Sequence, residues 1–346
     1  MKYFKIILIL LMSYSFSILS LKADDAAAGA SLGEFVKVGA AGAQFMKIPI
    51  GARATGMANT QGAVANDLTS VFWNPAGVAD IKSMSANFTY TSWIASFSHN
   101  FGAFALPLSE NYTIAAHIVS FTSGDIPITT IDQDYGTGSS YRVSDVNLGL
   151  TVSGYLTNQF SFGFTMKYIN NQFSEVAASG VAFDVGTMYD TEIQGIKLGF
   201  SIHNLGTQET YSGQDLNTTK KLNNSFYASP LDVAYLASSF ALPLTFRAGI
   251  SSEIISNKDM TLLVAADFIT FSDVAEQFSI GAEWGYKDII FVRGGYLFGQ
   301  DQFGLAGGVG IKYLTGGFSG QLDYSISPTF DLGLVNRIGI NIVMGD

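Results

Sequence analysis

The sequence predicts a transmembrane β-barrel, and three observations lead to this fold class. Only 13% of the 346 residues are charged, although the mean hydropathy is +0.27; soluble domains carry about a quarter charged residues. Beyond the N-terminus, no uncharged apolar run approaches the roughly 18 residues that a spanning helix needs. The apolar residues instead alternate with Gly, Ser, Thr and Asn, as in strands that face lipid on one side.

Residues 1–23 are predicted to be an export signal peptide. Lys2 and Lys5 supply the positive start, residues 6–21 form an apolar region interrupted by serines, and a cleavage site precedes Asp24. An uncleaved membrane anchor is the alternative interpretation. The sequence contains no Cys that could carry a lipid. We therefore expect delivery to the outer membrane of a Gram-negative-type bacterium.

Residues 24–82 form a second predicted unit, distinct from the barrel at 83–346. This segment is rich in Ala and Gly, alternates little, and contains short helical pieces near 51–65 and 67–73. Asp67 is expected to cap the second piece by accepting backbone N–H bonds.

From Met84 onward the pattern predicts about fourteen antiparallel strands, an even number of the kind bacterial barrels use. Residues 160–168 and 278–286 show the alternation most clearly, because side chains change face at every residue of a strand. The predicted strands are 84–92, 94–107, 112–121, 146–156, 160–173, 180–190, 196–205, 243–253, 260–270, 277–286, 288–298, 302–313, 316–327 and 332–344.

The connections agree with a barrel that starts on the periplasmic side. Barrels have long loops outside and short turns inside, and the long gaps at 122–145 and 206–242 both fall at outside positions. A soluble β-sandwich is the alternative for alternating strands. Its polar face would need many more Lys and Glu than this chain has.

Nine charged residues share the polar, inward face, roughly one per strand. They are Lys167, Asp184, Arg247, Asp267, Glu283, Arg293, Lys312, Asp323 and Arg337. Their signs predict the pairs Arg247 with Asp267, Glu283 with Arg293, and Lys312 with Asp323 and Arg337. Such pairs would neutralise the interior or hold a plug. The alternative is a polar substrate path, although a selective pore often favours one sign.

No motif in the chain indicates catalysis or a cofactor. His99, His117 and His203 lack the spacing of a metal site, and no Gly-x-Ser-x-Gly sequence marks a nucleophile. The glycines at 307–310 lie within a predicted strand and lack the Lys-Ser/Thr of a phosphate loop. A net charge of −10 without a basic patch argues against nucleic acid. We therefore expect no enzyme, no metal and no cofactor.

Residues 42–80 resemble the N-terminal signature of the PorV/PorQ family, outer-membrane proteins associated with type IX secretion and related to FadL-type fatty-acid transporters. The matching pieces are Gly51-Ala52-Arg53, Gly56-Met57, Ala65-Asn66-Asp67 and Trp73-Asn74-Pro75-Ala76-Gly77. Looser matches such as Asn204-Leu205-Gly206 extend the resemblance over nearly the whole mature chain. The chain departs from the common outer-membrane pattern because its last strand does not end on an aromatic residue.

The resemblance implies a fourteen-stranded barrel whose N-terminal segment folds into the lumen as a hatch of short helices. Arg53, Asn74, Pro75 and Gly77 are the candidate hatch residues. Arg53 would pair with an inward carboxylate such as Asp184, and Asn74-Pro75 would end a short helix. Four glycines would let the hatch backbone approach the wall: Gly51, Gly56, Gly62 and Gly77.

The resemblance also implies a non-enzymatic adaptor of type IX secretion, which receives exported cargo proteins and presents them at the cell surface. Its partners would be outer-membrane lipid, secretion-system proteins and cargo, with loops 122–145 and 206–242 as contact surfaces. Pro230–Leu236 is predicted as a lip helix or as a loop on the rim.

The alternative function is a FadL-like transporter of hydrophobic small molecules. This function would require an apolar pocket beneath the rim and a kink or opening in the wall. A purely structural barrel is the third interpretation.

Overall fold

The computed structural model describes residues 41–221, 229–315 and 317–345. The predicted signal peptide and the first part of the 24–82 segment lie outside these residues. Among the described residues, no helix is long and apolar enough to cross a membrane.

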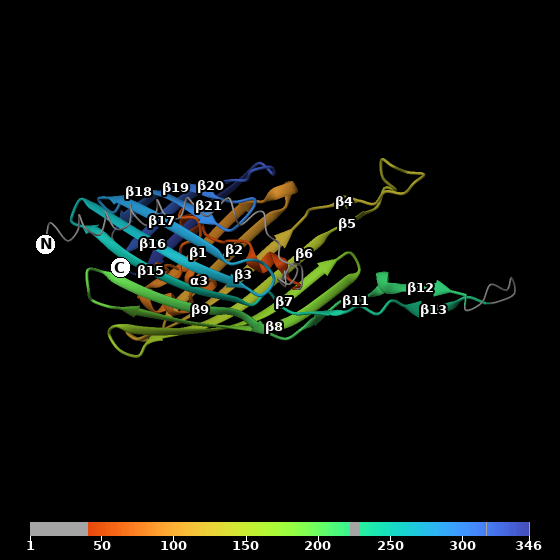
Figure 1. Cartoon of the computed structure of the whole chain (residues 1–346), viewed down its shortest axis with the longest axis horizontal. Coiled ribbons are helices and arrows are strands. Elements are labelled where there is room, and N and C mark those ends of the chain that lie inside the picture. Colours follow the sequence, from red (N-terminus) through yellow and green to blue (C-terminus); the bar gives the residue numbers. More distant parts are fainter. Residues whose placement is uncertain (1–40, 222–228, 316, 346) are drawn as a thin grey trace, which may run out of the picture. The chain divides into compact units, whose positions relative to one another are not determined.

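Within these described residues, fourteen long antiparallel strands close into a barrel (Figure 1). They are β1 (Met84–Ser92), β2 (Ser98–Pro107), β3 (Tyr112–Thr122), β6 (Val143–Tyr155), β7 (Phe160–Phe173), β8 (Val176–Asp190), β9 (Ile196–Gly206), β15 (Thr245–Ser256), β16 (Met260–Phe271), β17 (Gln277–Tyr286), β18 (Ile290–Phe298), β19 (Leu305–Thr315), β20 (Phe318–Pro328) and β21 (Leu334–Met344). Pairing of β1 with β21 and of β9 with β15 closes the ring. Each of these fourteen strands is therefore paired along both edges, as a membrane-spanning sheet requires.

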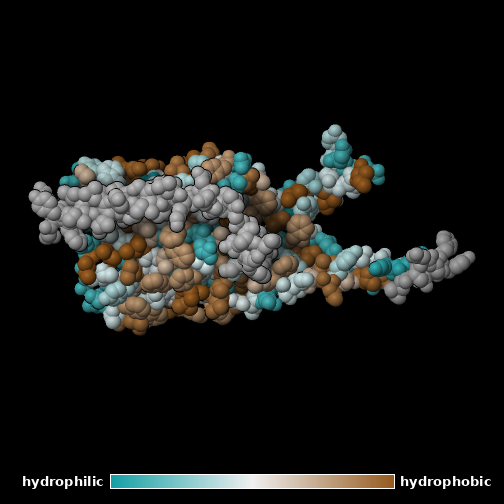
Figure 2. Space-filling view, in the orientation of Figure 1, coloured by the Kyte–Doolittle hydropathy of each residue, from teal (hydrophilic) through white to brown (hydrophobic). Residues whose placement is uncertain are grey.

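The strand faces follow the alternation of the sequence. On β17, Phe278 and Ile280 are exposed on the outer face, whereas Ser279 and Glu283 are buried inside. Hydrophobic residues accordingly cover much of the barrel surface in Figure 2. The predicted fold class is therefore confirmed: the strands turn apolar faces outward. Their inner faces are mostly small or polar, with apolar exceptions such as Phe101 and Ile169 that pack in one cluster with hatch residues.

Most predicted strand positions agree with the structure, and the clearest difference is at the start of β2. Residues 94–96 form a tight turn (η3, Ile94–Ser96) because Ala95 and Ser96 have φ values of 56° and 63°. Such values belong to the left-handed region rather than to a strand. The start predicted at residue 94 was therefore wrong, and β2 begins at Ser98.

Two of the predicted long loops contain hairpins of their own, which leave the barrel at the same end (Figure 1). The first pairs β4 (Ile126–Pro127) with β5 (Ser140–Tyr141). The second contains β10 (Glu209–Thr210), β11 (Ser212–Gly213), η4 (Gln214–Leu216), β12 (Asn217–Lys220), β13 (Leu231–Ala234) and β14 (Ser239–Phe240). The predicted lip helix was wrong, because residues 231–234 pair with β12 as a strand.

The N-terminal segment forms short helices whose residues are mostly buried. These are η1 (Gln44–Lys47), α2 (Ala52–Gly56), α3 (Ser70–Trp73) and η2 (Pro75–Asp80). Asp67 accepts the backbone N–H of Thr69 at 2.8 Å, just before α3. Asn74 is extended and its side chain accepts the N–H of Ala76, so it ends α3 and caps η2, with Pro75 as the first residue of η2.

Candidate functional site

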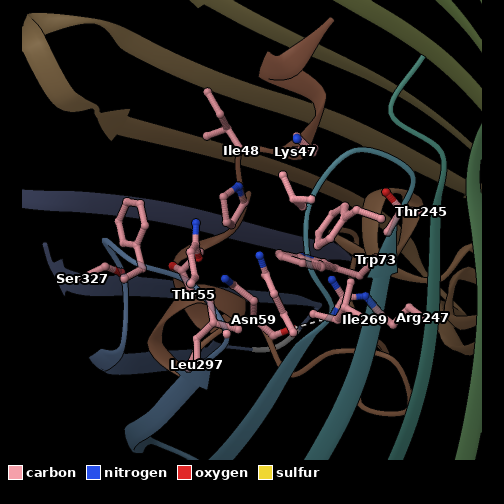
Figure 3. Close-up of a pocket in the computed structure, with 18 of the residues that line it drawn as sticks. Lys47, Ile48, Thr55, Asn59, Trp73, Thr245, Arg247, Ile269, Leu297 and Ser327 are labelled. Carbon is pink, nitrogen blue, oxygen red and sulfur yellow. Dashed lines mark hydrogen bonds between the residues drawn. The ribbon is translucent and has the colours of Figure 1, made fainter. Parts of the chain in front are cut away.

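A cavity of about 560 Å³ lies among residues of the hatch, the wall and the loops. The hatch contributes Thr55, Asn59, Phe72 and Trp73, and the segment 44–49 contributes Lys47 and Ile48 (Figure 3). Residues of the β16–β17 and β18–β19 connections, with Trp93 after β1, line it at the loop end. Its volume is typical of small-molecule sites, which usually measure about 300–1,000 Å³.

Large apolar side chains make up much of the cavity lining. Trp93 stacks on Phe303 with ring centroids 5.6 Å apart, and Phe72 meets Trp73 edge-on at 4.9 Å. Leu297 and Ile269 add aliphatic surface (Figure 3). Of these aromatic residues, the sequence marked Trp73 as part of the hatch motif. It gave no sign that Trp93 lines a cavity, because Trp93 lies in a connection where no alternation marks an inward side chain.

Eight of the nine predicted inward charges are buried in the interior, and Lys312 is the exception. The side chain of Lys312 is 27% exposed and pairs with Asp288 at 2.8 Å. The predicted pairing of Lys312 with Asp323 and Arg337 was therefore wrong. Asp323 lies opposite Gly310 in the register, two residues from Lys312, and pairs instead with Arg293 at 2.6 Å.

The two other predicted pairs are present, and both also hold the hatch. Arg247 binds Asp267 at 2.8 Å and donates to the carbonyl of Asn59. The other contacts of Asp267 are the backbone N–H groups of Gln61 and Gly62, at 2.8 and 2.7 Å. One carboxylate of the wall therefore binds both a neighbouring cation and the hatch backbone.

Glu283 joins Arg293 on the wall to Arg53 on α2. The Arg53 guanidinium donates twice to Glu283, at 2.9 Å each, and Arg293 donates to the same carboxylate at 2.5 Å. Arg53 also reaches Asp67 at 3.2 Å. The predicted pairing of Arg53 with an inward carboxylate is therefore present, but the partner is Glu283 and the predicted partner Asp184 was wrong.

Asp184 forms an ion pair with Lys167 at 2.5 Å and a hydrogen bond with Nδ1 of His203 at 2.9 Å. Nε2 of His203 contacts Ser201 Oγ at 2.8 Å, so Ser201, His203 and Asp184 form a chain like that of a serine hydrolase. Ser201 and His203 both also bind the carbonyl of Trp73, at 3.2 and 3.1 Å. These contacts indicate an anchor for the end of α3 rather than a free nucleophile.

Close backbone packing accounts for the glycines of the hatch. A Cβ on Gly56 would lie 3.1 Å from Gly308, and one on Gly62 would lie 3.0 Å from Gly249, so both face the wall as expected. Gly51 and Gly77 instead pack within the hatch, against Thr69 and the carbonyl of Ala65. The predicted wall contact was therefore wrong for these two.

The two remaining hatch candidates, Asn74 and Pro75, both contact the barrel wall. Asn74 Nδ2 donates to Gly62 at 2.8 Å and to Thr187 on β8 at 3.2 Å. Pro75 lies beside the wall glycines Gly163 and Gly186. The functional importance of Arg53, Asn74, Pro75 and Gly77 is therefore proposed to lie in seating the hatch.

The barrel wall is irregular next to the cavity. The β8–β9 register shifts between Phe183 and Val185, where His203 and Asn204 lie opposite Asp184. Asn204 has a φ of 63°, and its N–H binds Asp184 at 2.9 Å. Since His203 and Asn204 both line the cavity, this β-bulge bends the wall at the site itself.

Glu209 joins the base of the second hairpin to the wall and should respond to pH. Its side chain is buried, and one oxygen accepts a 2.7 Å bond from Asn171. Burial and, to a smaller extent, the charge of Asp145 raise the pKa of Glu209 to about 7, although the Asn171 bond opposes the shift. The folded protein therefore holds a proton that the unfolded chain loses near its ordinary pKa of 4.5.

The stabilisation from this proton is complete below about pH 4.5 and is lost as pH rises through about 7. We expect amide exchange in β10 and β14, corrected for its intrinsic rate, to be less protected at pH 8 than at pH 5. Glu209→Gln should remove this difference, because an amide does not titrate. An unchanged pH dependence in Glu209→Gln would assign the effect to another group.

Comparison with known proteins finds similar folds but no similar sequence family. No family model matches it, and no curated protein matches it. The monoaromatic hydrocarbon channel CymD matches with a TM-score of 0.57 and 12% identity over 86% of this chain and 98% of that one. The toluene transporters TodX of Pseudomonas putida and TbuX of Ralstonia pickettii match with TM-scores of 0.57 and 0.51, at 12% and 13% identity.

TodX is covered over 98% of its length by 85% of this chain, and TbuX over 98% by 86%. The chain therefore has a fold similar to that of these channels, and its described residues form a fourteen-stranded antiparallel barrel with short N-terminal helices. At these identities the likeness establishes the fold alone. None of these three channels is a PorV or PorQ protein, so the type IX resemblance stays a prediction from sequence.

Proposed function

We propose that this barrel takes up a hydrophobic small molecule from outside the cell and passes it through the outer membrane. The observation that carries the proposal is the cavity of about 560 Å³ with its aromatic lining, next to the hatch. The β8–β9 bulge beside the cavity supplies the wall irregularity that such a transporter requires. The similar structures named as toluene or hydrocarbon channels support the same class of ligand.

Ala275 provides a test of this function at the mouth of the cavity. Its side chain is exposed and lines the cavity in the β16–β17 connection, so Ala275→Trp should narrow the entrance without disturbing the core. We expect uptake of low concentrations of butylbenzene to fall severalfold in a Gram-negative host that lacks its own hydrophobic channel. Ala248→Trp on the outer wall is the control, because position 248 does not line the cavity. Equal uptake by both variants would contradict transport through the cavity.

A second candidate function is the type IX adaptor. Exposed apolar side chains on the two protruding hairpins favour it: Ile131 and Tyr135 on the first, and Leu236 on the second, are almost fully exposed. Exposed apolar groups that gather in one place, rather than singly, mark protein contact sites, and Ile131 and Tyr135 lie four residues apart in the tip of the same hairpin. We expect purification from outer membranes to recover exported cargo proteins or a secretion barrel if this function operates. Recovery should fall when Ile131 and Tyr135 are changed to Ser.

A further inference from the structure

Arg337 on β21 is a buried cation whose partners carry no charge. The residue is 1% exposed. Its Nη1 donates to Ser327 Oγ at 3.2 Å, and its guanidinium lies 5.7 Å from the Trp93 ring centroid. Within residues 41–221, 229–315 and 317–345, no carboxylate lies at salt-bridge distance from it, and its Nε has no hydrogen-bond partner.

The other cations that line the cavity differ from Arg337 in this respect. Lys47 pairs with Asp273, Lys167 with Asp184, and Arg247 with Asp267. A buried charge without a counter-charge is costly, and proteins usually pair it or lose it. Each of these three cations has a carboxylate partner within the barrel, whereas Arg337 has none among the described residues. The missing counter-charge at Arg337 therefore indicates a partner from outside the chain.

Two further polar groups without partners lie beside Arg337. Thr91 on β1 lies directly opposite Arg337, and His99 on β2 lies directly opposite Thr91. Thr91 Oγ1 and His99 Nε2 are buried and have no hydrogen-bond partner among the described residues. Native proteins leave few buried polar atoms unpaired. Of the three residues in this row, Arg337 lines the cavity and Thr91 and His99 do not, so Arg337 is the group that a ligand in the cavity could reach.

The surface next to this row is aromatic. The Trp93 ring lies near the Arg337 guanidinium and stacks on Phe303 with an interplanar angle of 25°. Leu297 and Ala306 also line the cavity. A flat ring placed against this pair would gain stacking contacts, while a carboxylate attached to it would reach the cation.

We propose that the ligand of this cavity is an aromatic acid, whose carboxylate binds Arg337 and whose ring packs against Trp93 and Phe303. This inference rests on the proposed transport function and narrows its substrate class. Charge-assisted hydrogen bonds contribute about 1.5–3 kcal/mol, which corresponds to about ten- to hundredfold in affinity. The acid should therefore bind much more tightly than a neutral hydrocarbon of the same shape.

The test compares three probes by titration calorimetry on the full barrel in mild detergent at pH 7.5. The probes are 4-butylbenzoate, its neutral counterpart butylbenzene, and the non-aromatic acid octanoate. We expect the Kd of 4-butylbenzoate to be at least about tenfold below that of either other probe. Arg337→Met should remove the preference for the acid over butylbenzene. Lys312→Met should keep it, since Lys312 is an equal charge outside the cavity.

The outcomes separate this inference from the function on which it rests. Binding of butylbenzene as tightly as 4-butylbenzoate, or an unchanged preference in Arg337→Met, would overturn the assignment of Arg337 but leave transport standing. Octanoate binding as tightly as 4-butylbenzoate would overturn the aromatic part. Failure of all three probes to bind would count against the proposed function itself. A rise in the thermal midpoint of Arg337→Met, together with lost acid binding, would exclude a merely structural role.

Discussion

Replacing Glu283 with Leu is expected to free α2 from the barrel wall. The substitution leaves two guanidinium groups without this carboxylate, the buried one of Arg293 on β18 and the half-buried one of Arg53 on the hatch, because Glu283 binds both at once. Removing one partner of a buried ion pair typically costs about 3–5 kcal/mol, since the remaining charge stays desolvated. Arg53 keeps its contact with Asp67, and Arg293 keeps its contact with Asp323. We therefore expect a loss of stability in the lower part of this range.

Limited trypsin digestion measures this loss, because the hatch carries its own cleavage sites at Lys47 and Arg53. We expect both sites to become accessible in Glu283→Leu while the barrel keeps its heat-modifiable migration on gels. Glu276→Leu is the matched control, because Glu276 is an exposed carboxylate in the preceding turn. If the hatch of Glu283→Leu resists trypsin as well as the hatch of Glu276→Leu, the ion pairs do not hold it.

Adding one methyl group at Gly163 is expected to displace the hatch and open the lumen. A Cβ there would lie 2.1 Å from the carbonyl carbon of Pro75 and 2.4 Å from the nitrogen of Ala76. Both atoms belong to backbone, so no side chain can rotate out of the way. Overpacking of this kind costs about 1–3 kcal/mol or more, and movement of η2 away from β7 relieves it.

Single-channel recording in planar lipid bilayers measures the result. We expect Gly163→Ala to show frequent open events where the natural chain shows few. Gly294→Ala is the control, because a Cβ at that position has its nearest neighbour at 4.0 Å. Equal conductance of the two variants would mean that contact between η2 and the wall does not close the lumen.

The fold was predictable from sequence because a membrane strand shows its two faces directly in its residue order. On β7 and β17, the alternating apolar positions became the outward-facing side chains. Hatch contacts were harder to predict, because Arg53 could reach several inward carboxylates and only the three-dimensional register selects Glu283 over Asp184. The same limit applies to Lys312, whose partner Asp288 lies in a turn rather than on the inner face.

The candidate site was predictable only in part. Its charged residues stood out, because charges are rare in this chain. Trp93 did not stand out, because it lies in a connection that carries no periodic signal. Phe303 was predicted as the start of a strand at 302–313, whereas β19 begins at Leu305 and Phe303 lines the cavity from the preceding connection. The spacing of His203 from the other histidines indicated no metal site and pointed to no other role. Its position two residues from Ser201, on the same face of β9, was the available sign of their hydrogen bond.

The position of the hatch also has a consequence for the order of assembly. Arg53 meets Glu283 across 230 residues of chain, and Thr55 binds Ser325 on β20 across 270. At its other end, the hatch binds Ser153 on β6 through Ala76. The hatch therefore precedes every barrel strand in the chain but cannot complete its contacts until β20 exists. Biogenesis must keep an apolar, glycine-rich segment from premature association until nearly the whole wall is in place.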